Sequence, residues 1–349
     1  MAIIDKPSDY FNTVLHTGTG SEQTVSGVGF QPDFTWIKSR SNGTPHVAQD
    51  SVRGATKQLI INTSDTETSY TQYLKSFNSD GFVLGTDSFV NANSQNYVSW
   101  NWKAGTSFTN DASGTGIGSI DSAGSVNTDA GFSIVSWTGT GSAGTIKHGL
   151  STTPSMIIIK NRSSAYDWTV GHNSLGWTNV VFLNLTTASQ GDTQFNNTAP
   201  TSSVFSIGTP LMANKSGDSI IAYCFSEKKG YSKFSSYIGN GSTDGTFVYT
   251  GFKPAFLIVK KTDSVNSWVM FDNKRSSSGG SNEIDYSLTA NEADAEETGT
   301  TSSDVDFCSN GVKIREDNGG VNASGGSYIY MAFAENPFVT STGVPATAR

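Results

Sequence analysis

Three stretches of the chain are apolar at nearly every position, and each follows a proline. They read D-F-T-W-I-K at residues 33–38, S-M-I-I-I-K at 155–160 and A-F-L-I-V-K at 255–260. A short run that is apolar on both faces is typical of a strand buried in the middle of a sheet. The pattern therefore predicts three central strands, one in each third of the chain.

A second pattern alternates large apolar residues with small or polar ones. Val98, Trp100 and Trp102 alternate with Ser99 and Asn101. The same spacing recurs twice downstream, at Ile221, Tyr223 and Phe225 and at Ile329, Met331 and Phe333. Period-2 alternation predicts half-buried strands, which would close each third of the chain.

Both patterns belong to a repeat. Identical residues stand 100 positions apart at Gly139/Gly239, Gly141/Gly241, Ser142/Ser242, Pro154/Pro254, Lys160/Lys260 and Trp168/Trp268. A more diverged copy lies upstream, with the same order at Gly18, Gly20, Ser21, Pro32 and Lys38. A repeat of this length is a whole domain. With about seven or eight strand-like runs in each copy, we expect an all-β chain of three tandem antiparallel β-sandwich units of jelly-roll or lectin-like type.

The repeat also sets the expected boundaries. They are an N-terminal arm at 1–9, a first unit at 10–104, a Gly/Ser-rich linker at 105–130, a second unit at 131–227, a third unit at 228–338 and a C-terminal tail at 339–349. Apolar residues within 105–130 could pin part of that segment to a neighbouring sheet. The second and third units adjoin directly, so we expect them to be rigidly docked and the first unit to be more loosely tied.

Composition narrows the classes of function. The net charge is -8 and no basic stripe is present, which argues against a nucleic-acid partner. No apolar run approaches the ~20 residues that span a bilayer, so no membrane insertion is expected, and the start lacks a signal-peptide pattern. The two cysteines, Cys224 and Cys308, make no disulfide framework and are expected to be small buried apolar residues.

Recognised catalytic and cofactor patterns are absent from the sequence. The four histidines, His16, His46, His148 and His172, have no metal-ligand spacing, and G-x-S-x-G does not occur. The recurring Gly-x-Gly-Ser follows a strand and opens no helix, so it predicts a tight turn or bulge and not a phosphate site. We therefore expect no enzyme activity, no metal and no cofactor.

One carboxylate motif has two interpretations. Asp50 and Asp272 are each followed three residues later by an arginine, Arg53 and Arg275, whereas the second unit has His172 at this place. The pair could hold a ligand in two of the three units. The favoured interpretation is a bidentate Asp–Arg pair that braces a strand end or loop.

Aromatic residues outside the repeated positions are candidates for stacking on sugar rings. These candidates are Trp177, Tyr166, Tyr70 and Tyr73. Trp168 and Trp268 recur between units, so core packing is expected for them instead.

Several motifs together carry a resemblance. These are K-P-S-D-Y-F-N-T at the start, G-x-G-F-Q-P-D-F-T-W-I-K, D-S-V-R-G, and S-Y-I-Y-M-A-F-A-E-N-P-F near the end. The chain resembles, from Lys6 to Phe338, a family of repeat-containing proteins of tailed phages that infect marine bacteria, whose genes often sit near tail-fibre genes. The resemblance implies a virion component made in the host cytoplasm, and its motifs carry no active site.

The expected function is therefore a non-enzymatic virion protein, tail- or fibre-associated and involved in host attachment. Its partners would be other virion proteins, with the arm as the docking segment, and a host cell-surface glycan bound through repeated weak contacts. A homo-oligomer is expected, with a trimer as one arrangement and a pseudo-threefold within one chain as another. The alternatives are a capsid decoration or head-fibre protein and a glycan depolymerase, which would need two carboxylates across a groove.

Overall fold

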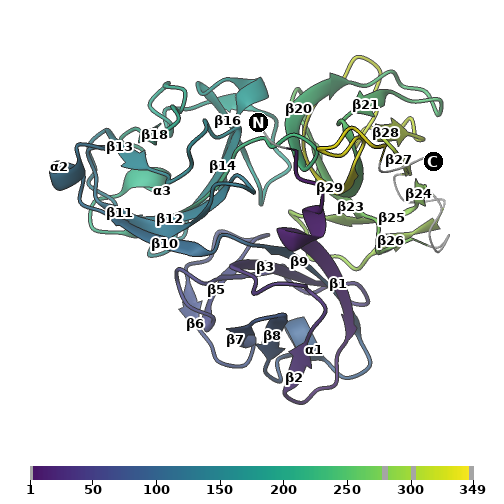
Figure 1. The fold of residues 1–349 in the computed structure, drawn as a ribbon, viewed down its shortest axis with the longest axis horizontal. Helices are drawn as coiled ribbons and strands as arrows, with labels where there is room; N and C mark the ends of the chain where they lie inside the picture. The colour runs from purple at the N-terminus through teal and green to yellow at the C-terminus, as the bar shows by residue number, and fades with distance from the viewer. Residues whose placement is uncertain (1–2, 277–281, 300–303, 346–349) are drawn as a thin grey trace.

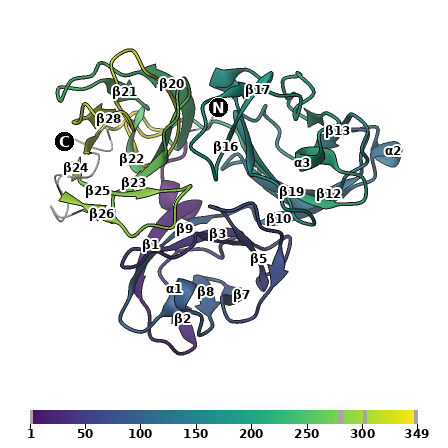
Figure 2. The ribbon, with the colours of Figure 1, turned by 180° about the vertical axis from the view of Figure 1, so that it is seen from behind.

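The computed structural model describes residues 3–276, 282–299 and 304–345, and its regular structure is almost entirely antiparallel β, as the sequence predicts (Figure 1). Three lobes surround a common centre, one for each unit of the sequence (Figure 1). The view from behind shows the same arrangement, with the short N-terminal segment at the centre (Figure 2).

The first unit has a large sheet with the strand order β1-β9-β3-β4-β5-β6 and a small sheet with the order β2-β8-β7. Its elements are η1 (Pro7–Asp9), β1 (Phe11–Thr17), β2 (Gln23–Val25), β3 (Phe34–Ser39), β4 (Val47–Asp50), β5 (Lys57–Ile60), β6 (Thr68–Ser69), β7 (Leu74–Asn78), β8 (Gly81–Leu84), α1 (Ser88–Asn91) and β9 (Asn96–Trp102).

The second unit has a large sheet with the order β10-β11-β12-β19-β14-β15-β16-β17 and a pair β13-β18. Its elements, with those of the preceding segment, are β10 (Thr106–Asn110), α2 (Ala112–Thr115), β11 (Ser122–Asn127), β12 (Phe132–Thr138), β13 (Gly144–Lys147), β14 (Met156–Asn161), β15 (Thr169–His172), η2 (Asn173–Leu175), β16 (Asn179–Phe182), β17 (Gln190–Gly191), β18 (Val204–Ile207), α3 (Leu211–Asn214) and β19 (Ser219–Phe225).

The third unit has a large sheet with the order β20-β29-β22-β23-β25-β26 and a small sheet with the order β21-β28-β27-β24. Its elements are β20 (Ser232–Ile238), β21 (Phe247–Tyr249), β22 (Phe252–Lys261), β23 (Trp268–Asp272), β24 (Glu283–Ile284), β25 (Tyr286–Thr289), β26 (Glu297–Thr298), β27 (Val305–Cys308), β28 (Gly311–Ile314) and β29 (Ser327–Pro337).

Six strands of each large sheet share one topology and one register. In every unit the central strand lies between the closing strand and the strand that follows it in sequence. The equivalent pairings are Phe34 with Trp102 and Asp50, Met156 with Phe225 and His172, and Phe256 with Phe333 and Asp272. Side chains at equivalent positions therefore point the same way in all three lobes.

Each central strand is buried on both faces because it separates two hydrophobic clusters. In the first unit, Ile37 packs with Phe82 and Tyr97 in a cluster between the large and small sheets, whereas Trp36 points to the opposite side. Separate clusters of the same kind lie within the second and third units. The prediction of three fully buried central strands is confirmed.

The opposite faces of the three large sheets meet in one shared core. The Trp102 ring lies 5.0 Å from Phe11, 6.4 Å from Phe225 and 5.7 Å from Phe333, so it contacts residues from all three units. The same buried cluster includes Trp168 of the second unit. The expectation that the first unit is loosely tied is wrong, because its large sheet supplies part of this common core.

The segment 105–130 is a structured extension of a sheet. Strands β10 and β11 form a hairpin that adds to β12 at the edge of the second large sheet. Ile120 is buried and pairs with Ile146. The polar composition suggested a linker, but a strand at a sheet edge needs few apolar side chains when its backbone is paired by a neighbour.

The N-terminal arm packs against the third unit. The amide of Ile4 donates to the carbonyl of Lys229 at 3.3 Å, and Pro7 is buried in the short turn η1. Asp5 accepts hydrogen bonds from the amide and hydroxyl of Ser341, which links the arm to the C-terminal segment. A free, unpacked arm is therefore the wrong expectation for residues 3–9; residues 1–2 and 346–349 lie outside the described range.

The Gly-x-Gly-Ser motif is a turn held by a buried asparagine, as the turn prediction requires. In the second unit, the side chain of Asn214 donates to the carbonyl of Ser142 at 2.6 Å and accepts from the amide of Thr140 at 2.8 Å. A Cβ on Gly139 would lie 2.2 Å from the carbonyl oxygen of Lys215, so only glycine fits there. Asn91 and Asn322 hold the equivalent turns.

Candidate functional site

The Asp272–Arg275 motif forms a buried brace between the third and first units. The Arg275 Nε donates to Asp272 Oδ2 at 2.6 Å, and the Trp100 Nε1 of the first unit donates to the same oxygen at 3.0 Å. Glu296 accepts from Arg275 at 2.9 Å and from Arg40 of the first unit at 2.8 Å. We call these five residues the Asp272 brace.

The Asp50–Arg53 motif builds an equivalent brace between the first and second units, which we call the Asp50 brace. Asp50 accepts from Arg53 Nε at 2.5 Å and from the Tyr223 hydroxyl at 2.7 Å. Glu67 accepts from Arg53 at 3.1 Å and from Arg162 at 2.8 Å. Burial alone would raise the pKa of Glu67, but the Arg162 and Arg53 guanidinium groups outweigh it and hold this pKa below its ordinary value.

The third interface, between the second and third units, closes without a charged brace. His172 occupies the place of the aspartate, and its Nε2 lies 3.3 Å from the carbonyl oxygen of Tyr330. Ser189 and Thr262 stand where the other interfaces have glutamate and arginine, and only a backbone hydrogen bond of 2.8 Å joins them. The absence of D-x-x-R from the second unit is thus matched by changes in its partner residues.

A ring N–H crosses each of the three interfaces at another equivalent position. The three bonds run from Trp168 Nε1 to the Ile60 carbonyl at 2.9 Å, from Trp268 Nε1 to the Phe182 carbonyl at 2.9 Å, and from His46 Nε2 to the Thr289 carbonyl at 3.0 Å. His46 therefore takes the structural place of a tryptophan. The bracing interpretation of D-x-x-R fits this geometry, and neither aspartate faces a groove where a ligand could reach it.

Three buried histidines are held in the neutral form. In His148 and His172 the Nδ1 accepts a backbone N–H at 3.1 Å, which leaves the proton on Nε2. His46 Nδ1 accepts from the Trp36 indole at 2.8 Å in the same way. Burial lowers the pKa of all three, to about 4 for His148 and His172, although each Nε2 bond to a carbonyl opposes the shift.

These lowered pKa values predict a loss of stability in mild acid. Between pH 6.5 and about 4 the unfolded chain binds protons at His148 and His172 that the folded chain does not, so stability falls as the pH falls through this window. Each site contributes on the order of 3 kcal/mol over the full window. Urea unfolding at pH 7, 5.5 and 4 measures the effect. A His172→Gln variant should show a smaller loss, and an unchanged loss would contradict the assignment.

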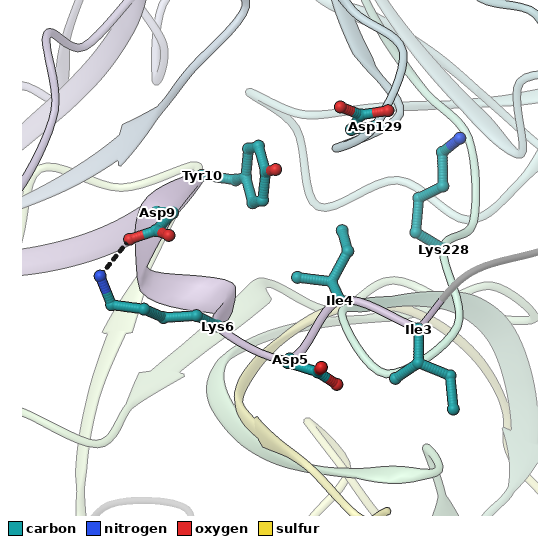
Figure 3. A pocket seen from close by; sticks show the side chains of 8 residues that line it. All are labelled: Ile3, Ile4, Asp5, Lys6, Asp9, Tyr10, Asp129 and Lys228. Atoms are coloured by element: carbon teal, nitrogen blue, oxygen red, sulfur yellow. Dashed lines mark hydrogen bonds and ion pairs between the residues drawn. The ribbon is translucent and has the colours of Figure 1, made fainter. Parts of the chain in front are cut away.

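A hollow of about 420 Å³ lies where the arm meets the starts of all three units (Figure 3). Ile4 and Tyr10 point into it, and Asp129 and Lys228 face it from the second and third units (Figure 3). Burial raises the pKa of Tyr10, and the carboxylates of Asp129 and Asp9 add to the rise. The hollow therefore mixes apolar walls with charges of both signs.

Two further hollows adjoin this one around an exposed tyrosine. Both are lined by Tyr249, Lys229, Gly230 and Gly251, and their volumes are about 390 and 200 Å³. The larger shares Lys228 with the arm hollow, and the smaller shares Ile3 with it. We call these two hollows together the Tyr249 trough.

Of the four aromatic residues proposed for glycan stacking, the structure brings together Tyr70 and Tyr73, whose ring centroids lie 4.9 Å apart. Trp177 is 8% exposed and packs against Phe195 in the second unit's own core. Tyr73 is 6% exposed beneath Phe89. Tyr70 is 40% exposed, and Tyr166 is half-buried in the second unit. No site brings the four together, and glycan contact by any of them stays a prediction.

Sequence reasoning missed the two most exposed aromatic residues of the third unit. Tyr249 is 61% exposed and Phe247 is 45% exposed, on the outer face of strand β21. Val248 between them is buried, so the large residues of this strand point outward. The signal available in the sequence was the small apolar Val248 between two aromatic residues, a pattern that allows the valine to be buried and the aromatic rings to be exposed. Cys224 is buried as expected, whereas Cys308 is half-buried, and both are free thiols.

The described residues contain neither a group of metal-binding side chains nor a membrane-spanning helix. Within residues 3–276, 282–299 and 304–345, no three His, Cys, Asp or Glu side chains are grouped so that they could hold a metal ion. In the same part of the chain, no helix has the length and hydropathy to cross a bilayer.

Comparisons with known proteins give a family and no activity. No curated protein and no solved structure gave a significant match. A family described as "Domain of unknown function (DUF7483)" matches residues 6–337, which include all three units. The chain therefore belongs to the DUF7483 family.

Proposed function

We propose that the chain is three tandem copies of one β-sandwich unit, and that it serves as a non-enzymatic, tail- or fibre-associated protein of a phage particle in host attachment. The observation that carries the proposal is the closed cycle of interfaces around one core. Each unit contacts the next through equivalent positions, and the third returns to the first. Such a ring supplies within one chain the threefold arrangement that a fibre commonly builds from three chains.

The two carboxylates considered for catalysis, Asp50 and Asp272, take part in the interfaces between units. Asp50 and Asp272 are buried and hydrogen-bonded to Arg53 and Arg275, so they cannot face a sugar across a groove. A depolymerase would need another pair of carboxylates at a spacing that fits an attacking water or a covalent intermediate. The geometry thus favours binding over cleavage.

The strand framework recurs in all three units, whereas many surface residues differ between them. The exposed Phe247 and Tyr249, for example, belong to the third unit alone, where β21 presents them. A rigid scaffold with variable surface residues suits recognition of an external ligand. Host glycan is the ligand we propose, with other virion proteins as the structural partners.

Gold-labelled antibody on intact particles of the phage that encodes the protein tests this proposal. Label at the tail or its fibres is the expected result. Label over the head would contradict the tail-associated role and favour capsid decoration, a role that a rigid ring could also serve. Purified particles that carry no label would contradict a virion role altogether, and release of reducing sugar from host capsule would contradict the non-enzymatic role.

A further inference from the structure

The Tyr249 trough combines an exposed aromatic wall with an excess of positive charge. Its larger hollow is lined by Lys228, Lys229 and Lys233, against the single carboxylate of Glu227. Lys233 pairs with Glu227 at 2.8 Å, so the three lysines of the hollow face only one carboxylate among its own lining residues; Asp129 of the adjoining arm hollow lies near Lys228. This local excess occurs in a chain whose net charge is -8. It marks the trough as a place for an anionic ligand.

The aromatic wall is fixed in position by its backbone. The Tyr330 hydroxyl donates to the carbonyl of Tyr249 at 3.4 Å, and the amides of Thr250 and Gly251 both donate to the carbonyl of Asn310 at 3.0 and 3.1 Å. The side chain nevertheless remains 61% exposed. A rigid strand end with a free aromatic ring is a preorganised surface, because little conformational entropy is lost when a ligand stacks on it.

Gly251 lies directly beside the ring. Its φ is +83°, a conformation that favours glycine, and a Cβ there would lie 3.5 Å from the Tyr249 hydroxyl oxygen. Both hollows include Gly251 and Tyr249, so the ring is shared by the two halves of the trough. A ligand longer than one ring could therefore follow the trough past the tyrosine.

Ser232 and Thr250 also line the larger hollow, but both are buried and already hydrogen-bonded: the Ser232 hydroxyl accepts from the amide of Lys228 at 3.0 Å, and the Thr250 hydroxyl donates to the carbonyl of Phe252 at 2.6 Å. Lys228 is half-buried, and this burial lowers its pKa while the nearby Asp129 carboxylate opposes the shift. An exposed aromatic ring face beside ammonium groups that outnumber the carboxylate of the hollow matches a pyranose that carries a carboxylate.

We infer that the Tyr249 trough binds an acidic oligosaccharide, such as an oligouronate. One sugar ring stacks on Tyr249, and its carboxylate lies against Lys228 and Lys229. This inference rests on the proposed function, because it names the class of glycan and the place where the glycan binds. It also moves the site away from Trp177 and Tyr73, whose rings are buried.

The test uses the purified full-length protein on an array of acidic oligosaccharides (galacturonate, mannuronate, guluronate, glucuronate and sialic acid) and their neutral counterparts. Titration then follows with the strongest acidic ligand and with its methyl ester, which keeps the shape and removes the charge. We expect binding of acidic oligosaccharides only, with a loss of about tenfold or more for the methyl ester and weaker binding at high salt.

Matched variants locate the site. Tyr249→Ala should lower affinity about tenfold and Lys229→Gln about three- to tenfold. Phe247→Ala removes the other exposed aromatic residue of the same strand, and Lys274→Gln removes an exposed lysine elsewhere; both should bind as the unaltered protein does. Melting curves confirm that each variant is folded.

Three outcomes would overturn the inference. They are no binding to any acidic oligosaccharide, equal losses in Tyr249→Ala and Phe247→Ala, and Tyr249-dependent binding of polyglutamate in place of sugars, which would assign the trough to an acidic peptide. These results are distinct from the particle-labelling test. A labelled tail without acidic-sugar binding refutes the trough alone, whereas Tyr249-dependent sugar binding by a protein absent from particles refutes the virion role alone.

Discussion

Replacing Asp272 with alanine is expected to lower the free energy of unfolding by about 3 to 5 kcal/mol. The substitution removes the acceptor of both the Arg275 Nε and the Trp100 Nε1, and all three groups are buried at the interface between the third and first units. Arg275 would keep Glu296, but its Nε and the indole N–H would be left without partners. Urea unfolding at pH 7 measures the change.

Two variants separate this cost from a general effect of losing a carboxylate. Glu22→Ala breaks the exposed Glu22–Lys75 pair and should change stability by less than about 0.5 kcal/mol. The double variant Asp272→Ala/Arg275→Met removes the buried charge as well as its partner, and Glu296 retains Arg40. It should recover at least half of the lost stability. If the single and double variants are equally destabilised, the unpaired charge is not the cause.

Replacing Trp102 with alanine should have an effect of similar size, about 3 to 5 kcal/mol, through loss of packing in the shared core. The Trp102 ring is buried against Phe11 of its own unit, Phe225 of the second and Phe333 of the third. A cavity at this point removes contacts from three large sheets at once. Thermal unfolding measures this change. We expect a single cooperative transition at a lower temperature than that of the unaltered protein.

The indole nitrogen of Trp102 provides a control for this interpretation. Its Nε1 is buried and has no hydrogen-bond partner among the described residues. Trp102→Phe therefore loses some volume but also removes an unsatisfied donor, and it should cost much less than alanine. A phenylalanine variant as unstable as the alanine variant would show that Nε1 has a role that packing does not explain.

The central and closing strands of each unit were predictable because each has a local sequence pattern. The proline and apolar run mark β3, β14 and β22, and the alternating residues mark β9, β19 and β29. The half-buried state predicted for the alternating strands is wrong, because polar residues such as Ser99 and Asn101 are buried as well. The Gly-x-Gly-Ser turn was predictable from its local pattern too, since its conformation requires glycine. The asparagine that holds it lies more than 70 residues away, and a contact at that separation leaves no local signal.

The sequence predicted only one side of each charged interface. D-x-x-R suggested a brace, but its partners Trp100, Tyr223, Arg40 and Arg162 lie in another unit. His46 was considered in the sequence only for metal-ligand spacing, although its ring donates across an interface where the other units use tryptophan. Chemical equivalence of unlike side chains becomes apparent only once the register is known.

Expectations that depended on polarity alone were the weakest. Segment 105–130 looked like a linker, yet backbone pairing with β12 makes it two strands. Trp177 and Tyr73 looked free because they do not recur, yet each fills space within its own unit. Tyr249 was overlooked because large residues in an alternating strand usually point inward, and β21 presents them outward.

Native-state hydrogen exchange on the closing strands β9, β19 and β29 tests most directly whether the three units behave as one body. The account predicts that the slowest amides of all three strands exchange only through global unfolding, with one common free energy, and that Asp272→Ala lowers this value equally in all three. Exchange in β9 at a lower free energy than in β19 and β29, or a loss of protection in Asp272→Ala confined to the third unit, would contradict it.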